Sequence, residues 1–270
     1  MADVKEPLDR LDRVQVRYLG VRREGAVVTV TIDRPERRNA LHPAAHAELA
    51  AVFDAYAADR DARVLVLTGA GERAFCVGSD LKERARTGAD QMPATGFGGL
   101  TERFDLDKPV LAAVNGDAIG GGLELVLACD LALAARHARF GLPEPRVGLA
   151  AHGGLHRLAR QVPLKRAMEI ALTGRLLSAE EALACGLLNA VVDAAELAAE
   201  VARWTEALLA AAPLALRATK QMMLRGLARG TVEAAFAGTY PAYEAMLASE
   251  DAREGMQAFI EKRAPVWRAR

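Results

Sequence analysis

The chain has 270 residues with 35 basic and 35 acidic side chains, so its formal net charge is zero. Half of the residues (51%) are apolar, which excludes a disordered chain, and the balanced charge argues against a protein held on nucleic acid by phosphate contacts. No apolar stretch reaches the roughly 18 residues of a membrane span, and the first 13 residues lack the apolar core of a secretory signal. We therefore expect a cytoplasmic globular protein without nucleic-acid or membrane partners.

Strands that alternate with helices are predicted for the first two thirds of the chain. Residues 14–19 and 26–32 alternate in polarity on either side of Gly25, which predicts two strands joined by a turn. His42-Pro43 precedes apolar residues at helical spacing, which predicts a helix. Apolar runs typical of buried strands follow at 63–67, 109–114 and 131–135. This alternation predicts an α/β core with parallel strands.

The last third of the chain predicts helices alone. Ser178 and Glu181 have the spacing of a capping box. Pro213 is placed to begin a helix, and Thr231 is placed to begin the next one after two glycines. We expect a core over residues 1–195 and a C-terminal helical region over 196–270. The many apolar positions of that region require a surface to pack on, for which a neighbouring subunit is a good candidate.

Several sequence patterns for cofactor, metal and nucleophile sites are excluded or disfavoured. The stretch TGAGERA resembles a dinucleotide-binding loop, but no helical period follows it, so we predict a tight turn. Neither Gly-Lys-Ser/Thr nor Gly-x-Ser-x-Gly occurs. His152 and His156 lack a third ligand, and the two glycines between them make one regular helix face doubtful, so we expect no metal site. The three widely spaced cysteines, which fit neither a disulfide framework nor a zinc site, are Cys76, Cys129 and Cys185.

Two glycine-containing segments are candidates for chemistry. Residues 115–125, NGDAIGGGLEL, carry three glycines before an apolar helix, where backbone N–H groups favour negative charge and predict an oxyanion site. Glu124 lies in the first turn of that helix, and two interpretations stay open: a buried functional carboxylate or a partly exposed one that stabilises the helix. Residues 74–83 form a second turn that runs into a helix. Glu144 lies between two prolines, which by itself favours a solvated surface turn.

Taken in order, these segments resemble the crotonase superfamily, the enoyl-CoA hydratase/isomerase family. The resemblance covers nearly the whole chain, from VTVTIDRPERRNAL through VLVLTGAGERAFCVGSDLKE and KPVLAAVNGDAIGGGLELVLACD to SEDAREGMQAFIEKRAPVW. It implies an α/β fold, a spiral of ββα units with a C-terminal helical trimerisation region, and trimers that often pair into hexamers. It also implies an acyl-CoA thioester substrate, with coenzyme A as part of the substrate and no separate cofactor.

The resemblance assigns roles to particular residues. Backbone N–H groups of Ser79 and Gly121 would hold the thioester oxygen, Glu124 would orient and activate water, and Glu144 would deliver the α-proton. Residues implied to contact coenzyme A are Arg37, Arg38, Ala40, Gly78, Asp80 and Leu81, joined from the C-terminal segment by Phe259 and Lys262.

These residues favour hydration of a 2-enoyl-CoA, because the matching positions in the hydratases are both glutamate. Double-bond isomerisation, carnitinyl-CoA-type dehydration and a non-catalytic binding member are the alternatives. The chain departs from the family pattern at Ser79, at Asp117 and in LAAHGGLHRL, which lacks the usual proline. The Gly-rich region 84–105 corresponds to the acyl pocket and leaves the acyl group open. We interpret the basic run Arg157, Arg160, Lys165 and Arg166 as a solvated helix face.

Overall fold

The computed structural model describes residue 11 and residues 14–87 and 91–270. The described chain divides into two compact units. The first unit extends to Phe104 and resumes over Val110–Ala202, and the second comprises Asp105–Pro109 and Arg203–Arg270. No helix in the described ranges is both long and apolar enough to cross a membrane.

The first unit contains a six-stranded sheet in the order β1-β2-β3-β5-β7-β10. β1 and β2 are antiparallel around Gly25, and every other neighbouring pair is parallel, which confirms the predicted α/β core. β5 is buried along its whole length, as expected for an apolar strand of a parallel sheet covered on both faces. The strands span β1 Leu19–Glu24, β2 Val27–Ile32, β3 Val64–Gly69, β5 Val110–Val114, β7 Leu131–Ala135 and β10 Ala190–Val192.

The first strand lies at a different place than predicted, and residues 74–76, expected to lie in a turn, form the buried strand β4. Residues 14–19 were expected to form the first strand, whereas β1 begins at Leu19. The backbone N–H groups of Arg17 and Tyr18 donate instead to the carboxylate of Glu48 on the first helix, at 3.0 and 2.9 Å. Pairing with β2, which sets Leu19 opposite Ile32, therefore determines the strand, and local alternation does not.

A smaller sheet, in the order β4-β6-β8-β9, carries the loops that matter for function. β4 (Ala74–Cys76), β6 (Asp117–Ile119) and β8 (Arg139–Gly141) are parallel, and β9 (Leu177–Ser178) is antiparallel to β8. The chain passes from the large sheet to the small one three times, from β3 to β4, from β5 to β6 and from β7 to β8. The turn between β3 and β4 contains no helix, which confirms that TGAGERA is a turn.

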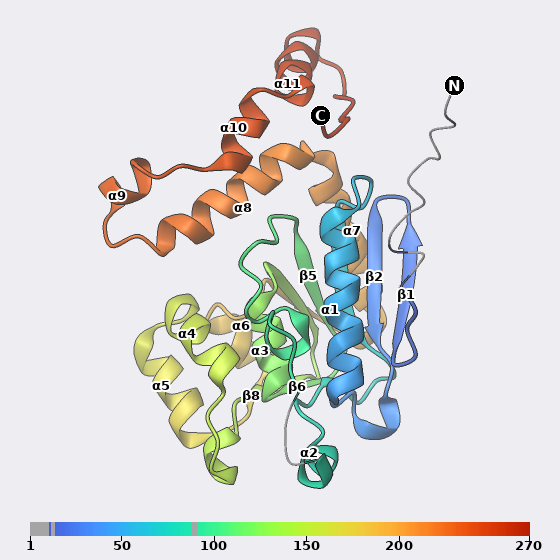
Figure 1. The fold of residues 1–270 in the computed structure, drawn as a ribbon, viewed down its shortest axis with the longest axis vertical. Helices are drawn as coiled ribbons and strands as arrows, with labels where there is room; N and C mark the ends of the chain where they lie inside the picture. The colour runs from blue at the N-terminus through green and yellow to red at the C-terminus, as the bar shows by residue number, and fades with distance from the viewer. Residues whose placement is uncertain (1–10, 12–13, 88–90) are drawn as a thin grey trace. The chain divides into compact units, whose positions relative to one another are not determined.

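Two helices of the first unit, α1 and α6, begin where the sequence predicts. α1 begins at Pro43, packs beside β1 and buries Leu49, Val52, Phe53 and Tyr56, as their spacing predicts (Figure 1). The capping box of Ser178 and Glu181 begins α6. The α-helices are α1 Pro43–Ala58, α2 Leu81–Thr87, α3 Gly121–Ala128, α4 His152–Gln161, α5 Leu164–Thr173 and α6 Ala179–Ala184. Short 3-10 helices are η2 Pro35–Arg37, η3 Phe97–Gly99, η4 Glu144–Val147 and η5 Ala194–Glu196.

The second unit is helical, as predicted for the last third of the chain. α8 begins at Pro213, and the Thr231 side chain accepts a hydrogen bond from Ala234 N at 3.1 Å at the start of α9. Leu227, Phe236 and several other large apolar side chains on these helices are exposed. The helices are α8 Pro213–Leu227, α9 Val232–Phe236, α10 Pro241–Leu247 and α11 Glu250–Glu261, preceded by α7 Leu197–Ala210, which crosses from the first unit.

Candidate active site

The candidate site lies where three neighbouring strands of the small sheet end. Gly78 follows β4, Gly120 follows β6, and Glu144 follows β8 after two residues. These strands are adjacent and parallel, so their carboxyl ends lie at one edge of the sheet. Gly78 and Gly120, which are 42 residues apart in the sequence, and Glu144, 24 residues further on, are thereby brought to the same edge.

The glycines at this edge allow the segments to approach closely. A Cβ atom at Gly78, whose φ is +89°, would lie 3.0 Å from Gly121 N, so the turn that carries Ser79 adjoins the start of α3. Gly121 is the first residue of α3, and its N–H therefore has no acceptor within the helix. At Gly120, with φ +58°, a Cβ would lie 2.7 Å from Glu144 Oε1. Because Gly120 has no Cβ atom, the Glu144 carboxylate can lie against its backbone.

Glu124 is a buried carboxylate held by the start of another helix. It is 6% exposed, so the interpretation as a solvated side chain is wrong. Its Oε1 accepts a hydrogen bond from Gly154 N at 3.1 Å, and a Cβ at Gly153 would lie 3.2 Å from its Oε2. The two glycines that made a regular α4 doubtful are the second and third residues of that helix. They are compatible with it because the Glu124 side chain occupies the space beside them.

Glu144 begins η4 and is half-buried. Its Oε2 atom is buried and has no hydrogen-bond partner among the described residues. The surface turn predicted from the local sequence is confirmed by the exposure of residues 145–150, but a fully solvated Glu144 is wrong, because β6 and β8 bring its carboxylate against Gly120.

The two carboxyl groups influence each other's ionisation. Burial and, after it, the charge of neighbouring Glu144 raise the pKa of Glu124 to about 7, against the opposing effects of the N–H groups of Gly153 and Gly154 and of the charge of Arg157. Burial also raises the pKa of Glu144. Because the charge of Glu144 raises the pKa of Glu124, the two groups disfavour ionising together, so that one can act as proton donor while the other acts as proton acceptor.

Two residues beside Gly121 were not predicted from the sequence. A Cβ on Gly121 would lie 2.4–2.6 Å from ring atoms of Phe97, so this ring packs directly on the glycine. His46 on α1 holds that segment, since its Nδ1 accepts from Gly98 N at 2.9 Å and its ring meets Phe97 edge-on at 4.6 Å. Burial lowers the pKa of His46 to about 4, so the ring is neutral. In the sequence, the glycines at 96–99 were the only feature that pointed to this segment as part of the site.

Most of the residues expected to contact coenzyme A lie together. Leu41 forms a bridge with Ser79, Leu41 N donates to Gly78 O at 2.8 Å, and Asp80 N donates to Leu41 O at 2.7 Å. The side chain of Arg34 connects the segment of Ala40 with that of Asp80. Its guanidinium donates to the carbonyl of Ala40 and lies 3.1 Å from Asp80 Oδ2.

Charge and exposure differ among these residues. Burial by itself raises the pKa of Asp80, but the hydrogen bond from Arg34 and the charges nearby hold it below the usual value. Arg37, Arg38 and Leu81 are exposed, whereas Ala40 is buried. Phe259 on α11 and Lys262 directly after it are exposed residues of the second unit.

Three other candidates from the sequence are Asp117, a metal site and the basic run that begins at Arg157. Asp117 is buried and pairs with Arg139 on β8 at 2.6 Å. The described residues contain no group of three or more His, Cys, Asp and Glu that fits a metal ion. Of the basic run, Arg157 is half-buried, so its assignment to a solvated face is wrong.

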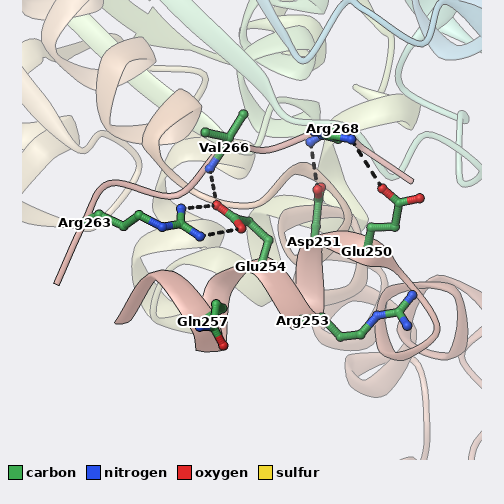
Figure 2. A pocket seen from close by; sticks show the side chains of 8 residues that line it. All are labelled: Glu250, Asp251, Arg253, Glu254, Gln257, Arg263, Val266 and Arg268. Carbon is green, nitrogen blue, oxygen red and sulfur yellow. Dashed lines mark hydrogen bonds and ion pairs between the residues drawn. The ribbon is translucent and has the colours of Figure 1, made fainter. Parts of the chain in front are cut away.

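A hollow of about 590 Å³ lies wholly in the second unit (Figure 2). Ion pairs such as Arg263 with Glu254, at 2.6 Å, line it together with the C-terminal segment, which Asp251 binds through Arg268 N at 2.7 Å. None of the predicted site residues lines this hollow.

Known proteins resemble the chain over most of its length. The family model described as Enoyl-CoA hydratase/isomerase matches residues 22–270. A carnitinyl-CoA dehydratase of Salmonella typhi is 43% identical over 260 residues, which cover 93% of this chain and 98% of that protein. The crystal structure of an enoyl-CoA hydratase from Mycobacterium tuberculosis H37Rv is similar with a TM-score of 0.86 and 37% identity, covering 94% of this chain and 99% of that one. A Mycobacterium marinum enoyl-CoA hydratase gives 0.88 and 39%, with the same coverage. The chain therefore belongs to the enoyl-CoA hydratase/isomerase family, with the crotonase fold of enzymes that act on acyl-CoA thioesters.

Proposed function

We propose that the protein is an enoyl-CoA hydratase-type lyase, which adds water across the 2,3 double bond of a 2-enoyl-CoA thioester. The observation that carries this proposal is the pair of carboxyl groups, Glu124 and Glu144, at the start of α3 beside Gly121. Hydration needs one group that takes a proton from water and one that supplies a proton to carbon. A pair of carboxyl groups that disfavour ionising together meets both needs.

In this mechanism ionised Glu124 accepts a proton from water while the water oxygen bonds to the β-carbon. The π electrons move onto the thioester oxygen, where the N–H groups of Ser79 and Gly121 stabilise the negative charge. Protonated Glu144 then gives its proton to the α-carbon, and the carbonyl re-forms. Each proton role contributes about 10²–10⁴ in rate, and one oxyanion donor about 10²–10³.

Coenzyme A binding is proposed for the joined segments 37–41 and 78–81. Arg37 and Arg38 are exposed cations beside a turn that carries half-buried Asp80, and cations of this kind suit the phosphates of the coenzyme. Ala40, Gly78 and Leu81 would contact its uncharged parts. Phe259 and Lys262 are proposed as further contacts, and a homotrimer or a hexamer of paired trimers is proposed as the assembly.

The dehydration of carnitinyl-CoA is the second candidate, favoured by the 43% identity to the Salmonella typhi enzyme of that name. Removal of water from a 3-hydroxyacyl thioester is the reverse of hydration and uses the same two carboxyl groups. The acyl group is what separates the two candidates.

The test is a panel of thioesters that contains straight-chain 2-enoyl-CoA compounds and one with a quaternary ammonium group. Loss of the conjugated absorbance and the product mass identify each reaction. Glu124→Gln and Glu144→Gln should each lower turnover at least about 10²-fold while coenzyme A binding persists. Turnover like that of the wild type in either variant would contradict the assigned pair, and a double-bond shift without added mass would indicate isomerisation instead.

A further inference from the structure

Arg157 is the half-buried arginine of α4. Its Nη1 donates to the backbone carbonyls of Thr101 and Gly153, the latter at 3.3 Å, and its guanidinium lies 5.6 Å from the centre of the Phe104 ring. Arg160, one turn further along the helix, is exposed and donates to His156 O of its own helix at 2.7 Å. Arg157 therefore binds a carbonyl of another segment, that of Thr101, whereas Arg160 binds a carbonyl of its own helix.

Both carbonyls bound by Arg157 belong to residues that pack around Glu124. A Cβ at Gly153 would lie 3.0 Å from Thr101 Oγ1 and 3.2 Å from Glu124 Oε2, so these three residues meet around one point. The next residue, Gly154, donates its N–H to Glu124 Oε1. By fixing the carbonyls of Thr101 and Gly153, Arg157 fixes the backbone that binds this carboxylate.

Arg157 also adds a positive charge to the surroundings of Glu124. The titratable groups that influence Glu124 are Glu144 from η4, the thiol of Cys76 from β4 and Arg157 from α4. Of those groups in the described part of the chain, Arg157 is the cation. Its charge stabilises the ionised form of Glu124.

We propose that Arg157 is a positioning residue of the active site, which holds the backbone around Glu124 and favours the ionised form of that carboxyl group. For its effect on turnover the inference rests on the proposed function, in which Glu124 takes the proton from water. For its effect on ionisation it rests on the contacts of Arg157 alone.

The experiment compares three variants. Arg157→Gln keeps an amide donor for the Thr101 carbonyl but removes the charge, Arg157→Met removes both, and Arg160→Gln is the matched control on the exposed face. The titration of Glu124 is followed by NMR on protein labelled with ¹³C at the glutamate carboxyl carbon, with the signal assigned by its loss in Glu124→Gln. The midpoint should rise by about one pH unit in both Arg157 variants and stay unchanged in the control.

Turnover gives the second readout. In the Arg157 variants kcat at neutral pH should fall about tenfold and the acidic limb of its pH profile should move upward with the NMR midpoint, while KM changes little. An unchanged Glu124 midpoint in folded Arg157→Gln protein overturns the inference, whatever the reaction. A raised midpoint in a protein that hydrates no thioester supports it and overturns the proposed function. If Arg157→Met does not fold, the Gln variant decides.

Discussion

Replacing Gly121 by alanine tests the contact on which the proposed oxyanion site depends. The new Cβ would lie 2.4–2.6 Å from three carbons of the Phe97 ring, whereas a normal carbon contact is about 3.5–4.0 Å. Either the ring or the start of α3 must therefore move by about 1 Å. The ring is 4% exposed and is held by His46, so it has little room to retreat.

Gly121→Ala should affect both the stability of the fold and the turnover. Overpacking of a buried site costs about 1–3 kcal/mol of unfolding free energy. A displaced Gly121 N–H would no longer point at the thioester oxygen, and the loss of one such donor costs about 2.7–4 kcal/mol of transition-state stabilisation, or about 10²–10³ in kcat. Phe97→Leu in the same chain shortens the opposing side chain and should recover part of both losses.

The assay is a double-mutant cycle of Gly121→Ala and Phe97→Leu, measured by urea unfolding and by kcat on a 2-enoyl-CoA. The coupling energy for unfolding should be at least about 1 kcal/mol, since the two sites are in contact. Gly20→Ala on β1 is the control, because its Cβ would meet Thr31 at an ordinary 3.6 Å. Additive effects, or a Gly121→Ala protein that unfolds and turns over like the wild type, would refute the reasoning.

Three further outcomes are expected. The pKa of Glu124 is about 7 in the folded protein and 4.5 in an unfolded chain, so between these pH values the unfolded state loses the proton while the folded state keeps it. The contribution of Glu124 to the free energy of unfolding should therefore fall by about 3 kcal/mol as pH rises from 4.5 to 7. Urea unfolding of wild type and Glu124→Gln at both pH values measures that fall, and an equal difference at both would contradict it. Asn39→Ala should cost about 3 kcal/mol by the same method, because buried Asn39 adopts φ +57° and binds the carbonyls of Ala70 and Ala74; a loss below about 1 kcal/mol would contradict this. Light scattering at micromolar concentration should give a trimer or hexamer, and a monomer mass would count against the proposed assembly.

Local sequence signals predicted those parts of the fold whose causes are themselves local. The capping box of Ser178 and Glu181 and the proline at the start of α8 specify their helices through neighbouring residues. The start of α3 was also predicted, because the glycines before Glu124 and the apolar run after it lie in one segment. The resemblance to a family then joined Glu124 to Glu144, which no spacing in the sequence could do.

The errors arose where a distant residue determines the outcome. The strand expected at 14–19 is displaced because Glu48, some 30 residues away, binds the N–H groups of Arg17 and Tyr18. The glycines of α4 are explained by the Glu124 side chain that packs against them. The direction of the Arg157 side chain is explained by its hydrogen bond to the Thr101 carbonyl. A helical period cannot reveal such partners, since it reports which face is apolar and not what the other chain segments bring to it.

The triple passage between the two sheets has a consequence for how specificity can diverge. Each passage contributes one end of a small-sheet strand to the site, and the ladder between β4, β6 and β8 holds those ends in register. The connection from β4 to β5, which contains Phe97 and Thr101, lies between two such ends and takes no part in that ladder. Exchanges in that connection outside Gly78–Asp80, Phe97 and Thr101 can reshape the region proposed to hold the acyl group while leaving Gly121 and the carboxyl pair where they are. The architecture thus separates the part of the enzyme that can vary from the part that performs the reaction.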